Sequence, residues 1–83
     1  MGTKTNELLQ RITANLKIFG SKPIIRSMRI SVEIILGLLA QNVTIEEILE
    51  DYPGLEREDV LACIAYAHAV LGNESLEEIK ITQ

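Results

Sequence analysis

The chain has 83 residues, of which 47% are hydrophobic and 24% charged, and its formal net charge is −4. This balance is typical of one small globular domain over residues 1–83 and excludes a disordered or low-complexity chain. The uncharged runs at 34–45 and 60–73 are shorter than the about 20 apolar residues that span a bilayer, and no apolar signal segment is present at the start. We therefore expect a cytoplasmic protein without membrane contact, and the single Cys63, which permits no internal disulfide, fits a reducing compartment.

The charges are distributed unevenly along the chain. Residues 1–30 contain six Lys or Arg and one acid, whereas residues 31–83 contain two Lys or Arg and eleven acids. A basic segment can contact phosphates or an acidic protein surface even where the whole chain is acidic. The sequence therefore predicts a basic N-terminal segment at 1–30 that would meet any polyanion, a helical core at 31–72 and a tail at 73–83.

The N-terminal segment contains short apolar stretches. Residues 7–20 contain Leu8, Leu9 and Ile12, which fit either a helical turn or an edge strand. Two β-prone stretches follow at 23–26 and 28–30, separated by Ser27, and together they predict a short β ribbon.

Three helices are expected after the ribbon. Ser31 can cap the first, in which apolar residues recur at helical spacing up to 41–42. Thr44 and Glu47 form a capping box that begins the second, which Pro53 and the following glycine end. The third begins after acids that suit a helix N-terminus and runs over 60–71, with Gly72 and Asn73 as its C-terminal cap. The predicted fold is mainly α: a helix-turn-helix-like three-helix domain preceded by a short N-terminal β ribbon.

The third helix lacks the side chains with which a recognition helix reads DNA. Residues 60–71 contain no Arg, Lys, Asn or Gln, and three acids lie at 56–59, where they would repel phosphates. A helical wheel places a core stripe on one side of this helix and three alanines, Ala62, Ala65 and Ala69, on the back. The expected core stripe is Val60, Leu61, Cys63, Ile64, Ala67, Val70 and Leu71.

The first helix is apolar over about two-thirds of its circumference, with only Glu33, Gly37 and Gln41 interrupting the apolar arc. So small a chain has little material to cover this surface, which predicts a homodimer. The alternative is that the ribbon and the N-terminal segment cover it within one chain. The expected dimer interface consists of Ile34, Ile35, Leu38, Leu39, Ala62, Ala65 and Ala69.

The sequence contains no set of side chains typical of a catalytic or metal site. Cys63 and His68 lie five residues apart, on different sides of a helix, and we interpret Cys63 as a small core residue and His68 as a partly buried, hydrogen-bonded side chain. The acids at 46–51 fit either a divalent cation or an ordinary solvated helix face. With one histidine and no glycine-rich phosphate loop, we predict no enzyme, no cofactor and no metal.

Lys22, Arg26 and Arg29 are the most informative polar residues. Three cations within eight positions of a short ribbon offer a compact site for phosphate or carboxylate groups. The alternative is that they are solvated edge-strand charges, which also prevent strands of different molecules from pairing. The residues alone do not decide between the two interpretations.

Three linked motifs resemble the domain-of-unknown-function family four-three-three. The chain reads GSKPIIRSMRISV at 20–32, TIEEILEDYPGL at 44–55 and EDVLACIAYA at 58–67. The family pattern is roughly GGKPxIRGTRIPV, an apolar helix, SPEEILxxYPxL and EDIxAALAYA, and the match covers about 8–71. Ser27 stands where the pattern has glycine, so the resemblance leaves the geometry of that turn open.

The resemblance implies a small helix-turn-helix-like domain and a non-catalytic, antitoxin-like function. Members often look like the antitoxin halves of VapB-type toxin–antitoxin pairs, so the implied partners are a PIN-like ribonuclease toxin and operator DNA. Lys22, Arg26 and Arg29 match the basic ribbon of the pattern, and arginines set against catalytic carboxylates would compete with the metal of the nuclease. The alternative is an orphan homodimeric interaction module whose ribbon is ordinary surface.

Overall fold

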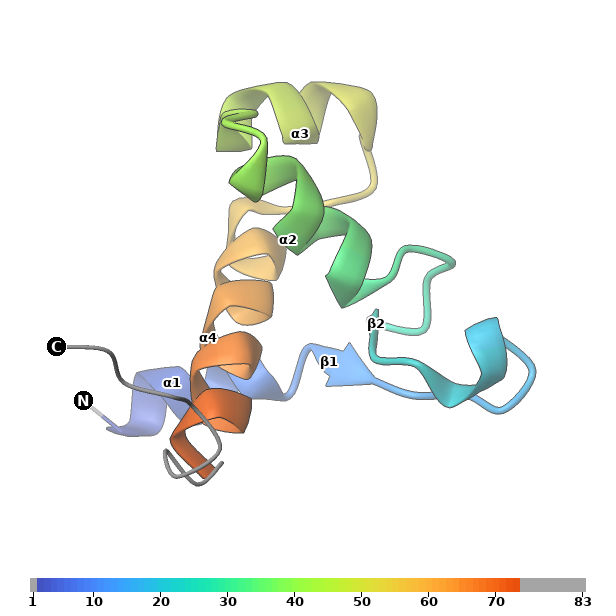
Figure 1. Ribbon diagram of the computed structural model, residues 1–83, viewed down its shortest axis with the longest axis vertical. Helices are drawn as coiled ribbons and strands as arrows, with labels where there is room; N and C mark the ends of the chain where they lie inside the picture. The colour runs from blue at the N-terminus through green and yellow to red at the C-terminus, as the bar shows by residue number, and fades with distance from the viewer. Residues whose placement is uncertain (1, 74–83) are drawn as a thin grey trace, which may run out of the picture.

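The computed structural model describes residues 2–73 of the protein. Its elements, in chain order, are α1 (Gly2–Leu9), β1 (Ile12–Thr13), the 3-10 turn η1 (Phe19–Ser21), β2 (Ile24–Ile25), α2 (Val32–Ala40), α3 (Ile45–Asp51) and α4 (Arg57–Asn73) (Figure 1). The predicted class is confirmed, since the chain is mainly helical with a small antiparallel ribbon near its N-terminus. None of the described helices is long and apolar enough to cross a membrane.

The first two helices of the predicted core begin where their capping residues indicate. The Ser31 hydroxyl accepts a hydrogen bond from the backbone N–H of Ile34 at 3.1 Å, which caps α2. The capping box of α3 is complete, because Thr44 Oγ1 accepts from the Glu47 N–H at 3.1 Å and the Glu47 carboxylate accepts from the Thr44 N–H at 2.9 Å. The hydrogen bond from the Thr44 backbone also lowers the pKa of Glu47. These caps satisfy backbone groups that a helix start otherwise leaves unpaired.

β2 lies between two segments: it pairs with an earlier strand that was not predicted, and it also contacts the predicted later segment, through an isolated antiparallel bridge between Ile24 and Ser31. β2 pairs with β1 in antiparallel register, Ile12 opposite Ile25 and Thr13 opposite Ile24. The predicted partner at 28–30 lies on the other side of β2, where it forms no strand, although the Ile25 N–H donates to the Ile30 carbonyl at 3.1 Å. β2 is therefore the central segment, which explains why both of its isoleucines are fully buried.

The turn after β2 has the left-handed geometry that hairpins prefer. The Met28 N–H donates to the Ile25 carbonyl at 2.7 Å, and φ is 46° at Arg26 and 63° at Ser27. Two central residues with positive φ are typical of a type I′ turn. Ser27 therefore occupies a conformation that favours glycine, and its backbone N–H is held by Thr13 Oγ1 at 2.9 Å.

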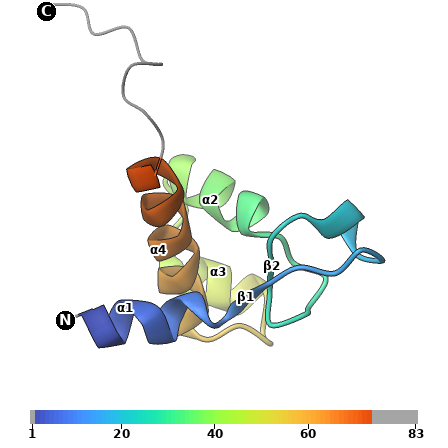
Figure 2. The ribbon, with the colours of Figure 1, turned by 90° about the horizontal axis from the view of Figure 1, so that it is seen from below.

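The sequence did not predict α1. This helix packs against α4 (Figures 1 and 2). Of the residues left open between a helical turn and an edge strand, Leu8 and Leu9 end the helix and Ile12 begins β1. The eight-residue α1 contains one glycine and two threonines, which form helices poorly, so we attribute its stability to packing on α4 rather than to propensity.

The expected orientation of α4 is wrong in part. Ala62, which was placed on the back, is fully buried in the core, whereas Ile64, Val70 and Leu71, which were placed in the core stripe, are exposed. The helix is apolar nearly all round, so its periodicity does not fix which side faces inward. The residues of the core cluster are Ile25, Val32, Ile35, Ile48, Leu55, Val60 and Cys63.

The expected C-terminal cap of α4 is also wrong. The helix continues through both Gly72 and Asn73, the last residue that the structure describes. The rest of the predicted tail at 73–83 lies outside the described residues.

Candidate functional site

An ion-pair network around the buried Asp59 joins the ribbon to the start of α4. Asp59 is 0% exposed, and its Oδ1 accepts from Arg26 Nε at 2.9 Å and from Arg11 Nη1 at 2.9 Å. Its Oδ2 accepts from Arg26 Nη2 at 2.7 Å and from the backbone N–H of Glu56 at 2.8 Å. Arg11 also pairs with the Glu56 carboxylate at 2.8 Å. The network thus contains two arginines and two acids, and its formal charge is zero.

The network favours the ionised form of Asp59. Burial alone would raise the pKa of Asp59, but hydrogen bonds from Arg26, from the Glu56 backbone and from Arg11 outweigh burial and hold that pKa below its usual value. The hydrogen bond to Asp59 raises the pKa of Arg26. Arg26 Nη2 also donates to the Gly54 carbonyl at 2.9 Å, so this one side chain ties the ribbon turn to the segment between α3 and α4. Arg26 is therefore part of the chain's internal structure, a role that neither interpretation of the ribbon anticipated.

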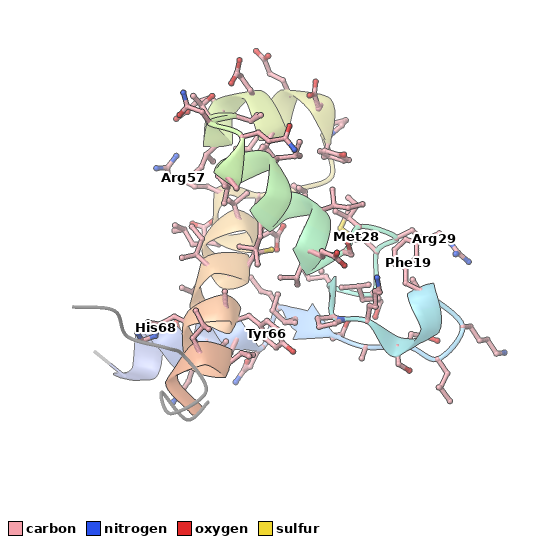
Figure 3. The ribbon with its side chains drawn as sticks, in the orientation of Figure 1. Phe19, Met28, Arg29, Arg57, Tyr66 and His68 are labelled. Atoms are coloured by element: carbon pink, nitrogen blue, oxygen red, sulfur yellow. The ribbon has the colours of Figure 1, made fainter. Side chains whose placement is uncertain are left out.

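The other two predicted binding residues differ from each other in their surroundings. Lys22 Nζ lies 3.1 Å from Glu33 Oε1 in an ion pair between two exposed side chains. Arg29 is exposed, makes no ion pair among the described residues, and points away from the helices (Figure 3). The structure therefore does not gather Lys22, Arg26 and Arg29 into one cationic site, and only Arg29 presents an uncompensated charge.

A loop at residues 14–22, which we call the arm, projects from the helical part of the molecule (Figures 1 and 2). Two of its large apolar side chains are open to solvent, Leu16 at 84% and Phe19 at 45%, whereas Ile18 between them is buried. Lys17 is exposed beside them and makes no ion pair within residues 2–73. These residues belong to none of the sites predicted from the sequence, although two large apolar side chains close to a lysine in a short, strand-poor segment were a usable signal.

The backbone of the arm is held in an uncommon conformation. Phe19, Gly20 and Ser21 follow one another with φ of 52°, 60° and 73°. The left-handed region costs a residue other than glycine roughly 1–2 kcal/mol. Strain of this kind is concentrated at functional sites, which makes the arm a candidate contact region.

A groove lies on each side of α2. One, of about 580 Å³, lies between the arm and α2; we call it the arm groove. The other, of about 400 Å³, lies between α2 and the later half of α4. Lys22 and Glu33 line both grooves, so the ion pair between these two residues lies at the boundary between the grooves. The arm groove is lined by Phe19, Lys22, Ser31, Glu33, Ile34, Gly37, Leu38 and Gln41.

The predicted dimer residues divide into three groups. Ile35 and Ala62 are fully buried in the core of their own chain, so their assignment to an interface is wrong. Leu38, Leu39, Ala65 and Ala69 are half-buried. Ile34 is 46% exposed and lines the arm groove, so the chain covers α2 on one side and leaves the other side open.

Cys63 and His68 lie in different environments. Burial, together with the nearby Asp59 charge, raises the pKa of Cys63 to about 12, so the thiol stays protonated at neutral pH. His68 is exposed rather than partly buried as expected. Within residues 2–73, no three or more His, Cys, Asp or Glu side chains are close enough to hold a metal ion. Of the acids at 46–51, Glu46 pairs with Arg57 at 3.4 Å and Glu47 belongs to the capping box.

Comparison with known proteins gives one match. The model of a family described as "Protein of unknown function (DUF433)" matches residues 12–67. No curated protein and no solved structure matches the chain. The matched span runs from β1 into α4 and includes Lys22, Arg26, Arg29 and Asp59, whereas α1 lies outside it. Because the match covers more than half of the 83 residues, the chain belongs to the DUF433 family.

Proposed function

We propose that this DUF433 chain is a non-catalytic, antitoxin-like interaction module that binds a PIN-like ribonuclease in the cytoplasm. The observation that supports it most is the arm, where the exposed Leu16 and Phe19 accompany Lys17, and Arg29 lies in a neighbouring loop. Neither cation has an acidic partner among the described residues. Aromatic side chains and arginines are enriched in protein interfaces, which favours a contact that includes Phe19 and Arg29.

Arg29 and the neighbouring arm together suit a carboxylate-rich partner. Arg29 can offer a planar fork of N–H donors to carboxylates of the kind that bind the metal of a nuclease. Leu16 and Phe19 would exclude water around that contact, and water exclusion strengthens it. Inhibition would follow because a guanidinium among the carboxylates competes with the metal. In this proposal Arg29 replaces Arg26 as the residue that carries the function, since Arg26 is already bound to Asp59.

Operator DNA is the weaker candidate partner. Residues 60–71 of α4 provide no side chains for reading bases, and its first turn contains Glu58 and the buried Asp59. Two uncompensated cations would give a salt dependence with a slope of only about −2. A steeper measured slope would require further cations, such as the internally paired Lys22 and Arg26.

The second candidate is a homodimeric interaction module that has no nuclease partner. The arm groove favours it, because this hollow of about 580 Å³ has the exposed Ile34 on one wall and Phe19 on the other. Apolar surface of this kind on so small a chain is typical of a contact with another chain.

The nuclease proposal is tested by calorimetric titration with a PIN-like ribonuclease encoded beside the gene. Arg29→Ala should weaken binding by about 10- to 100-fold, the effect of losing a charge-assisted hydrogen bond. The matched control is Arg57→Ala, which removes another exposed arginine that points from the start of α4 (Figure 3). This control should leave binding unchanged. Binding that neither Arg29→Ala nor Leu16→Ser weakens would show that the arm and Arg29 are not the binding site. If the chain neither binds nor inhibits the nuclease, the homodimeric module remains as the proposed function.

A further inference from the structure

Gly37 lies in the middle of α2, where nothing in its own chain requires a glycine. Its φ is not in the positive range, in contrast to Gly20 in the arm. A Cβ built on Gly37 meets no atom within 4 Å, so packing within the chain does not require it either. Glycine inside a helix costs about 1 kcal/mol relative to alanine. The missing side chain therefore leaves space for something outside the chain.

The space at Gly37 opens into the arm groove. Gly37 lies beside the apolar Ile34 and Leu38 on the α2 side of this groove. The distance between two packed helices depends on the size of the side chains at their contact. A glycine between two apolar residues therefore lets another helix approach α2 closely at this point.

We infer that the occupant is a second copy of this chain, whose α2 packs antiparallel on the first around a two-fold axis at Gly37. Glu33 and Gln41 precede and follow Gly37 by four residues, so both lie on its face of the helix and both line the groove. In an antiparallel pair centred on Gly37, the Glu33 carboxylate comes opposite Gln41 of the partner subunit, whose amide N–H can donate to it. The same contact repeats across the axis. This is the self-complementarity that a two-fold interface requires.

The Lys22–Glu33 ion pair lowers the free-energy cost of burying Glu33 at this contact. Lys22 Nζ lies 3.1 Å from Glu33 Oε1 within one chain, so the carboxylate keeps a cationic partner when the second copy excludes water. A carboxylate without such a partner would be costly to bury. Ile34 is 46% exposed in the single chain and would be covered by the second copy. This inference rests on the homodimer of the second candidate function and is independent of nuclease binding.

The test is sedimentation equilibrium of the full chain from about 5 to 500 µM, a range that reports dissociation constants in the micromolar region. We expect a mass of twice 9.3 kDa at the upper end. Gly37→Ala should weaken the dimer by about 10- to 100-fold, because overpacking a close contact is unfavourable. The thermal midpoint of dilute protein should rise or stay the same, since alanine favours the helix and the methyl group has room.

The matched control is Gly72→Ala, because Gly72 is also helical and its added Cβ also meets no atom within 4 Å. It should leave dimerisation unchanged. Ile34→Lys should weaken the dimer at least as much as Gly37→Ala, and Leu71→Lys, which alters an exposed residue of α4, should not.

Three results would overturn the inference: a monomer at every concentration, a dimer insensitive to both Gly37→Ala and Ile34→Lys, or a Gly37→Ala chain that unfolds more readily. The last would mean that the chain itself needs the glycine. A monomer that still binds the nuclease would overturn this inference alone. A dimer that binds no nuclease would support it and overturn the first proposed function.

Discussion

Replacing Asp59 with Asn should destabilise the fold far more than replacing any exposed acid. The substitution removes the charge that three side-chain hydrogen bonds from Arg11 and Arg26 compensate, while the side chain stays nearly the same size. Breaking a buried ion pair by removing one partner costs about 3–5 kcal/mol. The arginine side chains are 29% and 39% exposed, so water can solvate them afterwards, and we expect a lower cost of about 2–3 kcal/mol.

This loss is large for a chain of 83 residues, whose total free energy of unfolding should be about 4–12 kcal/mol. The measurement is urea unfolding followed by circular dichroism at 222 nm and pH 7. With a urea dependence of about 1 kcal/mol per molar, Asp59→Asn should lower the midpoint by about 2–3 M. The control Glu46→Gln breaks only the exposed Glu46–Arg57 pair and should leave the midpoint unchanged.

The pH dependence provides an independent check on the same residue. Because the folded chain holds the pKa of Asp59 below its usual value of about 3.9, its stabilising contribution is present above that pH and is lost as the pH falls through the folded pKa. The stability difference between the natural chain and Asp59→Asn should therefore shrink below about pH 4. An Asp59→Asn chain as stable as the natural one at pH 7 would refute the importance of the network, as would a difference that persists unchanged at pH 2.

Experiments at three further residues, Ser27, Thr44 and Cys63, test local features of the structure. Ser27→Gly should stabilise the chain by about 0.5–1 kcal/mol by relieving a positive φ of 63°, and Ser27→Val should destabilise it; thermal unfolding of both measures this. Thr44→Ala should cost about 1 kcal/mol in urea unfolding through loss of the α3 capping box, whereas Thr13→Ala at the ribbon should leave the helix content unchanged. Cys63 should react with a thiol reagent only in urea, because burial raises its pKa to about 12; rapid labelling of the folded chain would contradict its placement in the core. Since that pKa is raised, the stability it confers should decline as the pH rises above about 9.

The features that the sequence predicted correctly are those with local signals. Ser31, Thr44 and Pro53 act on backbone groups within one helical turn, so their positions fixed the limits of α2 and α3 within a residue or two. The ribbon was harder, because strand partners are chosen by burial in three dimensions. Ile24 and Ile25 pair with a segment about a dozen residues earlier, and nothing in the nearby pattern indicates this partner.

The site was predicted less well, because its charges interact over long separations in the chain. Asp59 was assigned only to the N-terminus of a helix, although its partners Arg26 and Arg11 lie 33 and 48 residues away. No periodicity reveals such a pairing. α4 is apolar on most sides, so its rotation also depends on α1, which packs against it and was not foreseen.

The contact of two copies at Gly37 is tested most directly by disulfide trapping. Gly37→Cys should form a covalent dimer on mild oxidation at about 500 µM, since a two-fold axis at that residue brings the two Cα atoms within the about 7 Å that a disulfide requires. Gly72→Cys is the control, and the buried Cys63 should not compete in either variant. On a non-reducing gel we predict a dimer band for Gly37→Cys and a monomer for Gly72→Cys. A monomer for Gly37→Cys, or equal trapping of both variants, would contradict the proposed contact.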